Sequence, residues 1–102
     1  MTHHVLKCHP PMYHAVVNGT KPFEVRKDDR AFQTGDTVEL EYYDPNIPGG
    51  GNENFNKPMS PVTYEKIYPK IKRKITFVLR GGQYGIEPGY VVLALKEIET
   101  DD

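Results

Sequence analysis

The sequence predicts an α+β, mainly β fold: a small, partly closed barrel of about five or six strands with one short N-terminal helix. Three observations support this prediction. Segments in which apolar and polar residues alternate recur along the chain, turns rich in glycine and asparagine separate them, and only one short stretch has helical spacing. The chain has 102 residues, so we expect a single domain over 1–102.

The first two elements follow from local signals. Residues 2–7 are expected to form a strand, which the prolines that follow it end. Because proline is tolerated in the first turn of a helix, a short helix should begin at Pro10 or Pro11 and run to Val17. Asn18-Gly19 is a typical helix end. The helical residues expected to pack inward are Met12, Ala15 and Val16.

The remaining strands are predicted at 22–27, 37–43, 74–79 and 90–98. The side chains expected to share one face are Val38, Leu40 and Tyr42 in the second of these and Ile75, Phe77 and Leu79 in the third. The last strand is almost continuously apolar, which predicts a central or barrel-closing position. Residues 44–61 contain four prolines and three consecutive glycines, which indicates a long loop insertion.

Composition excludes several classes of protein. No run of about 18 apolar residues is present, so no membrane span is expected. The first residues lack the pattern of a secretory signal. Cys8 is the single cysteine, which rules out an internal disulfide and favours a reduced, cytoplasmic setting. The net charge of −1 argues against a strongly basic nucleic-acid binder, but residues 66–80 hold six basic residues and no acid, which predicts one basic edge.

Metal binding is not expected. The candidate ligands are His3, His4, Cys8, His9 and His14. Their spacings match no zinc pattern, and the two adjacent histidines would face opposite sides of a strand. The sequence gives no sign of an organic cofactor either.

The strongest candidate site is the stretch Gly19-Thr20-Lys21-Pro22-Phe23-Glu24-Val25-Arg26. Glu24 and Arg26 share one face of the expected strand, while Phe23 and Val25 take the other, which we expect to be core. Arg26 suits a phosphate or carboxylate. Lys21 adds a point charge, provided that the turn swings it round. Glu24 would accept hydrogen bonds from a nucleobase or hold Arg26 in place; the alternative is a simple surface ion pair.

Further candidates surround this stretch. Tyr84, in the glycine-rich segment 81–85, is placed to stack on a base. Lys7 would reach the same site, and Arg30 would either join it or brace Asp29. If the chain is an enzyme, Lys21 and Glu24 are the proton-transfer groups. Cys8 beside His9 is a weak nucleophile candidate, because adjacent strand residues point apart.

The pattern Gly19-x-Lys21-x-x-Glu24-x-Arg26 resembles the motif G-x-K-x-x-E-x-R of the ASCH domain family. The segment Phe32-x-x-Gly35-Asp36 and the ending Gly85-Ile86-x-x-Gly89-Tyr90 resemble a small bacterial and phage branch of that family. The resemblance covers most of the chain and departs at about 45–72, where this sequence is longer.

The resemblance implies a PUA-like β-barrel with a cleft beside the helix, lined by Lys21, Glu24 and Arg26. It also implies links to RNA, to coactivator-type roles and, in a few members, to hydrolysis of RNA or acylated nucleosides. Those hydrolases look to carry a threonine where this chain has Glu24. We therefore expect an RNA- or nucleotide-binding domain. The alternatives are a hydrolase of RNA or modified nucleosides, and a protein-interaction module that uses the 44–61 insertion.

Overall fold

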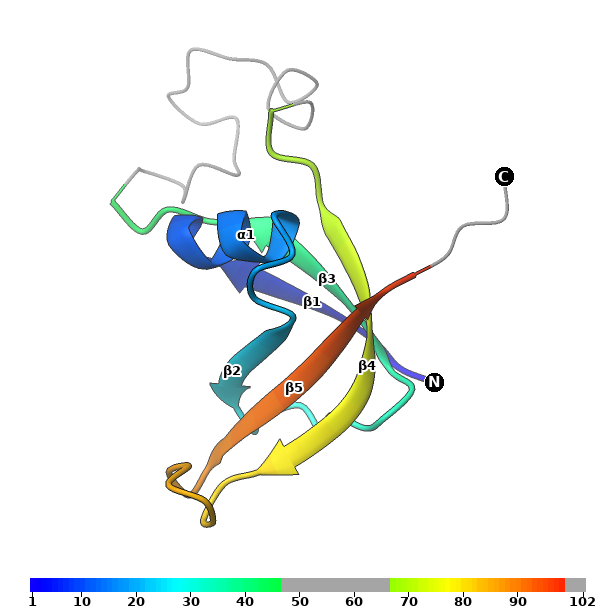
Figure 1. Cartoon of the computed structure of the whole chain (residues 1–102), viewed down its shortest axis with the longest axis vertical. Coiled ribbons are helices and arrows are strands. Elements are labelled where there is room, and N and C mark those ends of the chain that lie inside the picture. The colour runs from blue at the N-terminus through cyan, green and yellow to red at the C-terminus, as the bar shows by residue number, and fades with distance from the viewer. Residues whose placement is uncertain (47–66, 99–102) are drawn as a thin grey trace.

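The structure, a computed structural model, describes residues 1–46 and 67–98. Its elements are β1 (His3–Cys8), α1 (Pro10–Val17), β2 (Phe23–Lys27), β3 (Thr37–Tyr42), β4 (Ile71–Arg80) and β5 (Tyr90–Glu97). The five strands form one curled sheet that resembles half a barrel, with α1 at one end (Figure 1). This confirms the mainly β, partly closed barrel with one short helix. Most of the predicted 44–61 insertion lies outside the described residues.

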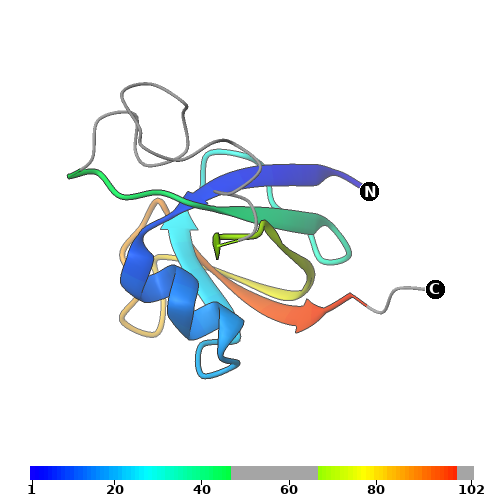
Figure 2. The same ribbon diagram turned by 90° about the horizontal axis from the view of Figure 1, so that it is seen from above.

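The strand order, β1-β3-β4-β5-β2, leaves β1 and β2 as the two edges of the sheet. β1 runs parallel to β3, and the other three pairings are antiparallel. Seen from above, the curl of the sheet brings β2 back towards β1 (Figure 2). The two edge strands do not pair in this order, so a gap remains between them.

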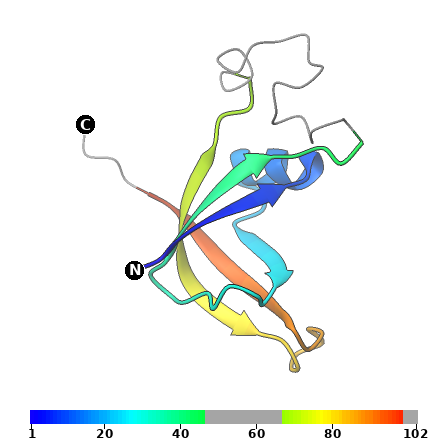
Figure 3. The ribbon, with the colours of Figure 1, turned by 180° about the vertical axis from the view of Figure 1, so that it is seen from behind.

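The core fills the inside of the curl. β5 lies between β4 and β2, as predicted for a central strand, and its Val91, Leu93 and Leu95 are buried. α1 lies against one face of β1 and β3 (Figure 3), where Tyr13 meets the ring of Tyr42. Within the described residues, no helix is long and apolar enough to cross a bilayer.

The predicted faces of β2 are wrong. Glu24 is 3% exposed, whereas Phe23 is 40% and Val25 53% exposed. Alternation separates the two faces of a strand but does not say which one meets the core. Here the inward positions are those of the charged residues, and their mutual ion pairs make burial of Glu24 tolerable.

Two further predictions about side-chain direction are wrong. Met12 is 49% exposed, because α1 turns Tyr13 and Val16 towards the sheet instead. Phe77 does not share a face with Ile75: Ile75 is buried and Phe77 is 60% exposed, because a bulge between them shifts the register of β4. After the bulge, Val78 packs against the core in its place.

The glycine-rich segment 81–85 belongs to the connection between β4 and β5, as expected of a hairpin. The Gly81 N–H donates to the carbonyl of Tyr90, and a Cβ at Gly81 would lie 2.0 Å from the carbonyl oxygen of Glu87. That close approach of two backbone segments requires glycine at this position.

Candidate functional site

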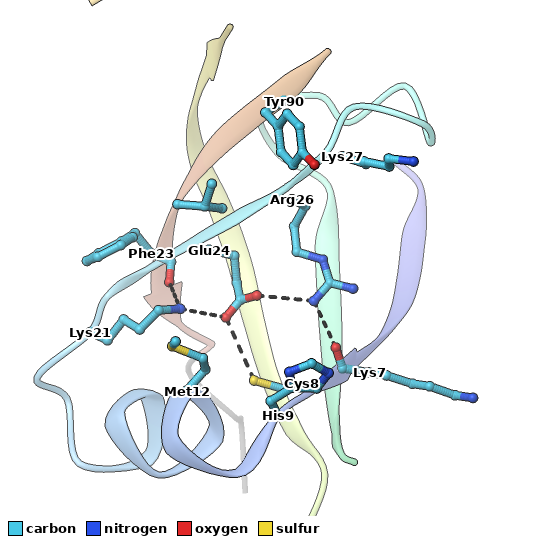
Figure 4. Close-up of a pocket in the computed structure, with 11 residues that line it drawn as sticks. Lys7, Cys8, His9, Met12, Lys21, Phe23, Glu24, Arg26, Lys27 and Tyr90 are labelled. Atoms are coloured by element: carbon cyan, nitrogen blue, oxygen red, sulfur yellow. Dashed lines mark hydrogen bonds and ion pairs between the residues drawn. The ribbon is translucent and has the colours of Figure 1, made fainter. Parts of the chain in front are cut away.

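A pocket of about 650 Å³ opens along the gap between the edge strands β1 and β2 (Figure 4). We call it the seam pocket. Its lining residues come from the end of β1, the start of α1, the turn before β2, β2 itself and the start of β5. They are Lys7, Cys8, His9, Met12, Lys21, Phe23, Glu24, Val25, Arg26, Lys27 and Tyr90.

The turn between α1 and β2 carries Lys21 into this pocket. Gly19 adopts a φ of 78°, a left-handed conformation that glycine permits. The N–H groups of Thr20 and Lys21 then both donate to the carbonyl of Ala15, at 3.0 and 3.1 Å. The chain therefore reverses tightly, and the Nζ of Lys21 reaches the carboxylate of Glu24. The turn thus brings Lys21 to the same side as Glu24, which the alternation of side chains along a strand would not do by itself.

Glu24 sits between two cations. Its Oε1 lies 2.8 Å from Lys21 Nζ, and its Oε2 lies 3.3 Å from Arg26 Nη1. The side chain of Glu24 is only 4% exposed, so the two cations compensate a charge that burial would otherwise disfavour. Because two cations share one carboxylate, the cluster carries one positive charge in excess.

Two arginines donate hydrogen bonds to backbone carbonyls on the outer edge of β1. Arg26 Nη1 donates to the carbonyl of Lys7 at 2.8 Å, and Arg30 Nη1 donates to the carbonyl of Val5 at 2.8 Å. Val5 and Lys7 are two residues apart, so both carbonyls point to the same side of the strand, away from β3. Arginine side chains thus bridge the gap where strand pairing would otherwise close the barrel.

Arg26 keeps unused donors. Its bonds to Lys7 and Glu24 both use Nη1. In residues 1–46 and 67–98, no partner is found for its Nε and Nη2 groups. These two nitrogens form the edge of a guanidinium that binds carboxylate or phosphate in a bidentate manner.

Cys8 lies beside the cluster of Lys21, Glu24 and Arg26. Its Sγ is 3.9 Å from Glu24 Oε1. Burial, together with the negative charge of Glu24, raises the pKa of Cys8 to about 12. The thiol is therefore protonated near neutral pH, which disfavours a nucleophilic role. His9 stacks on the ring of Tyr43, with ring centroids 5.9 Å apart.

Residues 3–95 match a protein family described as a domain of unknown function, DUF3850. The chain belongs to this family. The match begins with β1 and ends within β5, so it contains every element that lines the seam pocket. No curated protein matches the chain. The description of the DUF3850 family assigns no activity, so a function has to be inferred from the geometry of the pocket.

This DUF3850 domain brings some of the predicted site residues together and leaves others apart. Lys21, Glu24 and Arg26 meet, and the backbone of Lys7 joins them (Figure 4). The side chain of Lys7 extends away from Glu24, with its Nζ 4.8 Å from the ring centroid of Tyr43. The roles predicted for these residues in ligand binding stay predictions.

Arg30 and Tyr84 lie outside the lining of the seam pocket. Arg30 Nε is 3.9 Å from a carboxylate oxygen of Asp29, which agrees with the predicted bracing of these two residues. Tyr84 projects from the β4–β5 connection and is 85% exposed.

Sequence reasoning missed five lining residues, which are Met12, Phe23, Val25, Lys27 and Tyr90. Met12, Phe23 and Val25 were expected to pack in the core. Tyr90 and Lys27 are paired by the register of β2 on β5, which local patterns do not reveal. A tyrosine at the start of a strand gives no signal of its own for a pocket wall.

Two histidines at the start of β1 make structural hydrogen bonds. His3 and His4 face opposite sides of the strand, as predicted: His4 is buried and its Nε2 lies 2.9 Å from Asp36 Oδ2, whereas His3 bonds the Thr37 hydroxyl. The described part of the chain contains no group of three or more His, Cys, Asp or Glu side chains arranged to hold a metal ion.

Proposed function

We propose that the chain binds RNA or a nucleotide-like ligand in the seam pocket, through Arg26. One observation carries the proposal. Arg26 is held in place by Glu24 and by the Lys7 carbonyl through a single nitrogen, and its Nε–Nη2 edge has no partner among the described residues. A guanidinium fixed in this way loses little conformational entropy when a phosphate binds it.

The electrostatics of the pocket favour an anion. The side chains of Lys21 and Arg26 are 14% and 24% exposed, so solvent screens them less than it screens surface charges. The excess positive charge of the cluster is matched by a ligand with one or more negative charges. Lys7 and Lys27 at the pocket lining add to the attraction.

The walls of the pocket suit a flat, partly apolar group. Met12, Phe23 and Tyr90 line it beside the charged cluster. Aromatic side chains next to cations are the surfaces on which proteins stack nucleobases. A ligand that combines a phosphate with a base fits both parts of the lining better than a simple anion does.

Glu24 acts as a positioning residue in this proposal. Both of its oxygens already accept bonds from cations, and the side chain is almost fully buried. Of the two roles that the sequence suggests, holding Arg26 in place is therefore favoured over reading the edge of a base.

The test is a titration of a labelled, mixed-sequence single-stranded RNA, followed by fluorescence anisotropy at low and moderate salt. Arg26→Ala should weaken binding about tenfold or more, because it removes a charge-assisted contact to phosphate. Arg30→Ala is the matched control. It also removes one positive charge and one hydrogen bond to a backbone carbonyl of β1, but Arg30 does not line the pocket. Equal affinities for all three proteins would rule out the proposal.

The resemblance to the ASCH family supports RNA as the ligand, and the buried free thiol of Cys8 fits the predicted cytoplasmic setting. The hydrolase alternative would use Lys21 and Glu24, which are engaged with one another at 2.8 Å. Product formation that disappears in Glu24→Gln, with binding retained, would support it. The interaction-module alternative rests on an insertion that lies mostly outside the described residues.

A further inference from the structure

Two phenylalanines flank one alanine on the outer side of the sheet. In the register of the strands, Phe23 of β2 pairs with Ala94 of β5, and Ala94 also pairs with Phe77 of β4. Neighbouring strands lie about 4.8 Å apart, so the two aromatic residues stand on either side of the smallest side chain in the row. Phe77 is 60% and Phe23 40% exposed.

The next row continues this apolar surface. Val25, which is 53% exposed, pairs with Val92, and Val92 pairs with Leu79. All these residues occupy the positions that alternate with the buried ones, so they share the side of the sheet that faces away from the core. We call this side of β2, β5 and β4 the outer face. Exposed apolar patches that span several strands usually mark binding sites.

The charged residues of the outer face are all lysines. On β2 and β5, Lys27 and Lys96 continue the outward positions, and on β4 Lys72 and Lys74 precede the bulge. Lys74 and Lys96 are direct cross-strand partners. No acid occupies an outward position of these three strands, all of which lie within the described residues. The apolar patch is thus bordered by positive charge at both ends.

This pattern selects among possible occupants. A second copy of the chain would bring the same lysines together, and like charges disfavour such a contact. Single-stranded nucleic acid supplies what the outer face lacks, because its phosphates match the lysines and its bases have flat faces for the phenylalanines. One class of RNA-binding domain binds single-stranded RNA in this manner, by stacking bases on aromatic side chains of its sheet.

We propose that the outer face binds single-stranded nucleic acid, with bases stacked on Phe77 and Phe23 and phosphates at Lys27, Lys74 and Lys96. The outer face does not include the charged cluster of Lys21, Glu24 and Arg26, but it borders the seam pocket. Phe23 lines the seam pocket, and Lys21 Nζ lies 5.0 Å from its ring centroid. A nucleic-acid strand bound across the outer face would therefore reach the seam pocket, which Arg26 also lines, and in this respect the inference extends the proposed function.

The test compares two labelled probes of equal length, a 12-nucleotide single-stranded RNA and the corresponding abasic oligomer, which keeps the phosphates and lacks the bases. Phe77→Ala should weaken binding of the RNA about tenfold, because it removes one base–aromatic contact, and should leave the abasic oligomer unaffected. Phe77→Tyr should restore RNA binding. Val17→Ala removes an apolar side chain of α1 that is 49% exposed and serves as the control.

The outcomes separate this inference from the proposed function. Loss of RNA affinity in Phe77→Ala supports the inference, even if Arg26→Ala has no effect. RNA binding that depends on Arg26 but is the same in Phe77→Ala and wild type overturns the inference and leaves the pocket proposal standing. A dimer of the wild type that Phe77→Ala dissociates, or affinity changes that are equal for both probes, would also overturn it.

Discussion

Arg26 donates a hydrogen bond from Nη1 to the backbone carbonyl of Lys7 at 2.8 Å, and so joins two edge strands that do not pair with each other. Direct pairing of β1 with β2 would close the barrel and fill the gap. The arginine side chain satisfies the free carbonyl at a greater separation of the two backbones. The seam pocket exists because a long side chain, rather than a neighbouring strand, completes the edge of β1.

The buried carboxylate of Glu24 should matter for stability. Glu24→Gln keeps the shape of the side chain but removes the charge that compensates Lys21 and Arg26. We expect the free energy of unfolding to fall by about 1–3 kcal/mol. Urea denaturation at neutral pH measures it. Glu87→Gln, at an exposed glutamate, is the control and should leave the stability unchanged. Equal stability of Glu24→Gln and wild type would contradict this account of the cluster.

Cys8 should be inert in the native protein. Its thiol is buried, and burial together with Glu24 raises its pKa to about 12, so the thiolate is scarce at pH 8. We expect a thiol-specific disulfide reagent to modify the native protein at least about a hundredfold more slowly than the urea-unfolded chain. Rapid native modification would show that Cys8 is accessible and ionised, and would reopen its role as a nucleophile.

Asp36 should make stability depend on pH. Burial by itself would raise the pKa of this carboxyl, but hydrogen bonds from His4 and from the N–H groups of Thr2 and Gln33 outweigh burial and hold the pKa below its usual value of 3.8. A lowered folded-state pKa stabilises the protein above the unfolded value, and this contribution is lost as the pH falls towards the folded value.

Asp36→Asn should therefore lower the free energy of unfolding near pH 7 by about 1–3 kcal/mol, with a smaller difference from wild type below about pH 4. Denaturation curves at several pH values test this. Asp29→Asn is the control, because the side chain of Asp29 is 63% exposed. A difference between Asp36→Asn and wild type that is the same at pH 3 and pH 7 would show that the carboxylate charge is not involved.

Local patterns predicted the elements well, because helix and strand signals are local. The helix over 10–17 and the strand over 37–42 were both expected within one residue. Long-range relationships were not accessible in this way. The parallel pairing of β1 with β3 and the bulge before Phe77 depend on contacts between distant segments.

The candidate site likewise has features that local patterns predicted and features that depend on contacts between distant residues. The motif brought Lys21, Glu24 and Arg26 to attention, and the structure places them in contact. The inverted faces of β2 were missed, because hydrophobicity alone assigns Phe23 to the core and Glu24 to solvent. Only the cations on both sides of Glu24 make the opposite arrangement stable, and those contacts require the turn that carries Lys21.

The proposed function requires that the free edge of Arg26 receives a phosphate. NMR spectra of the arginine side-chain Nε–H groups, recorded while a nucleoside monophosphate is added, test it most directly. We expect the Nε–H signal of Arg26, assigned by its absence in Arg26→Lys, to shift in a saturable manner while that of Arg30 stays in place. Unchanged Arg26 signals at millimolar nucleotide, or equal shifts for every arginine, would contradict the claim.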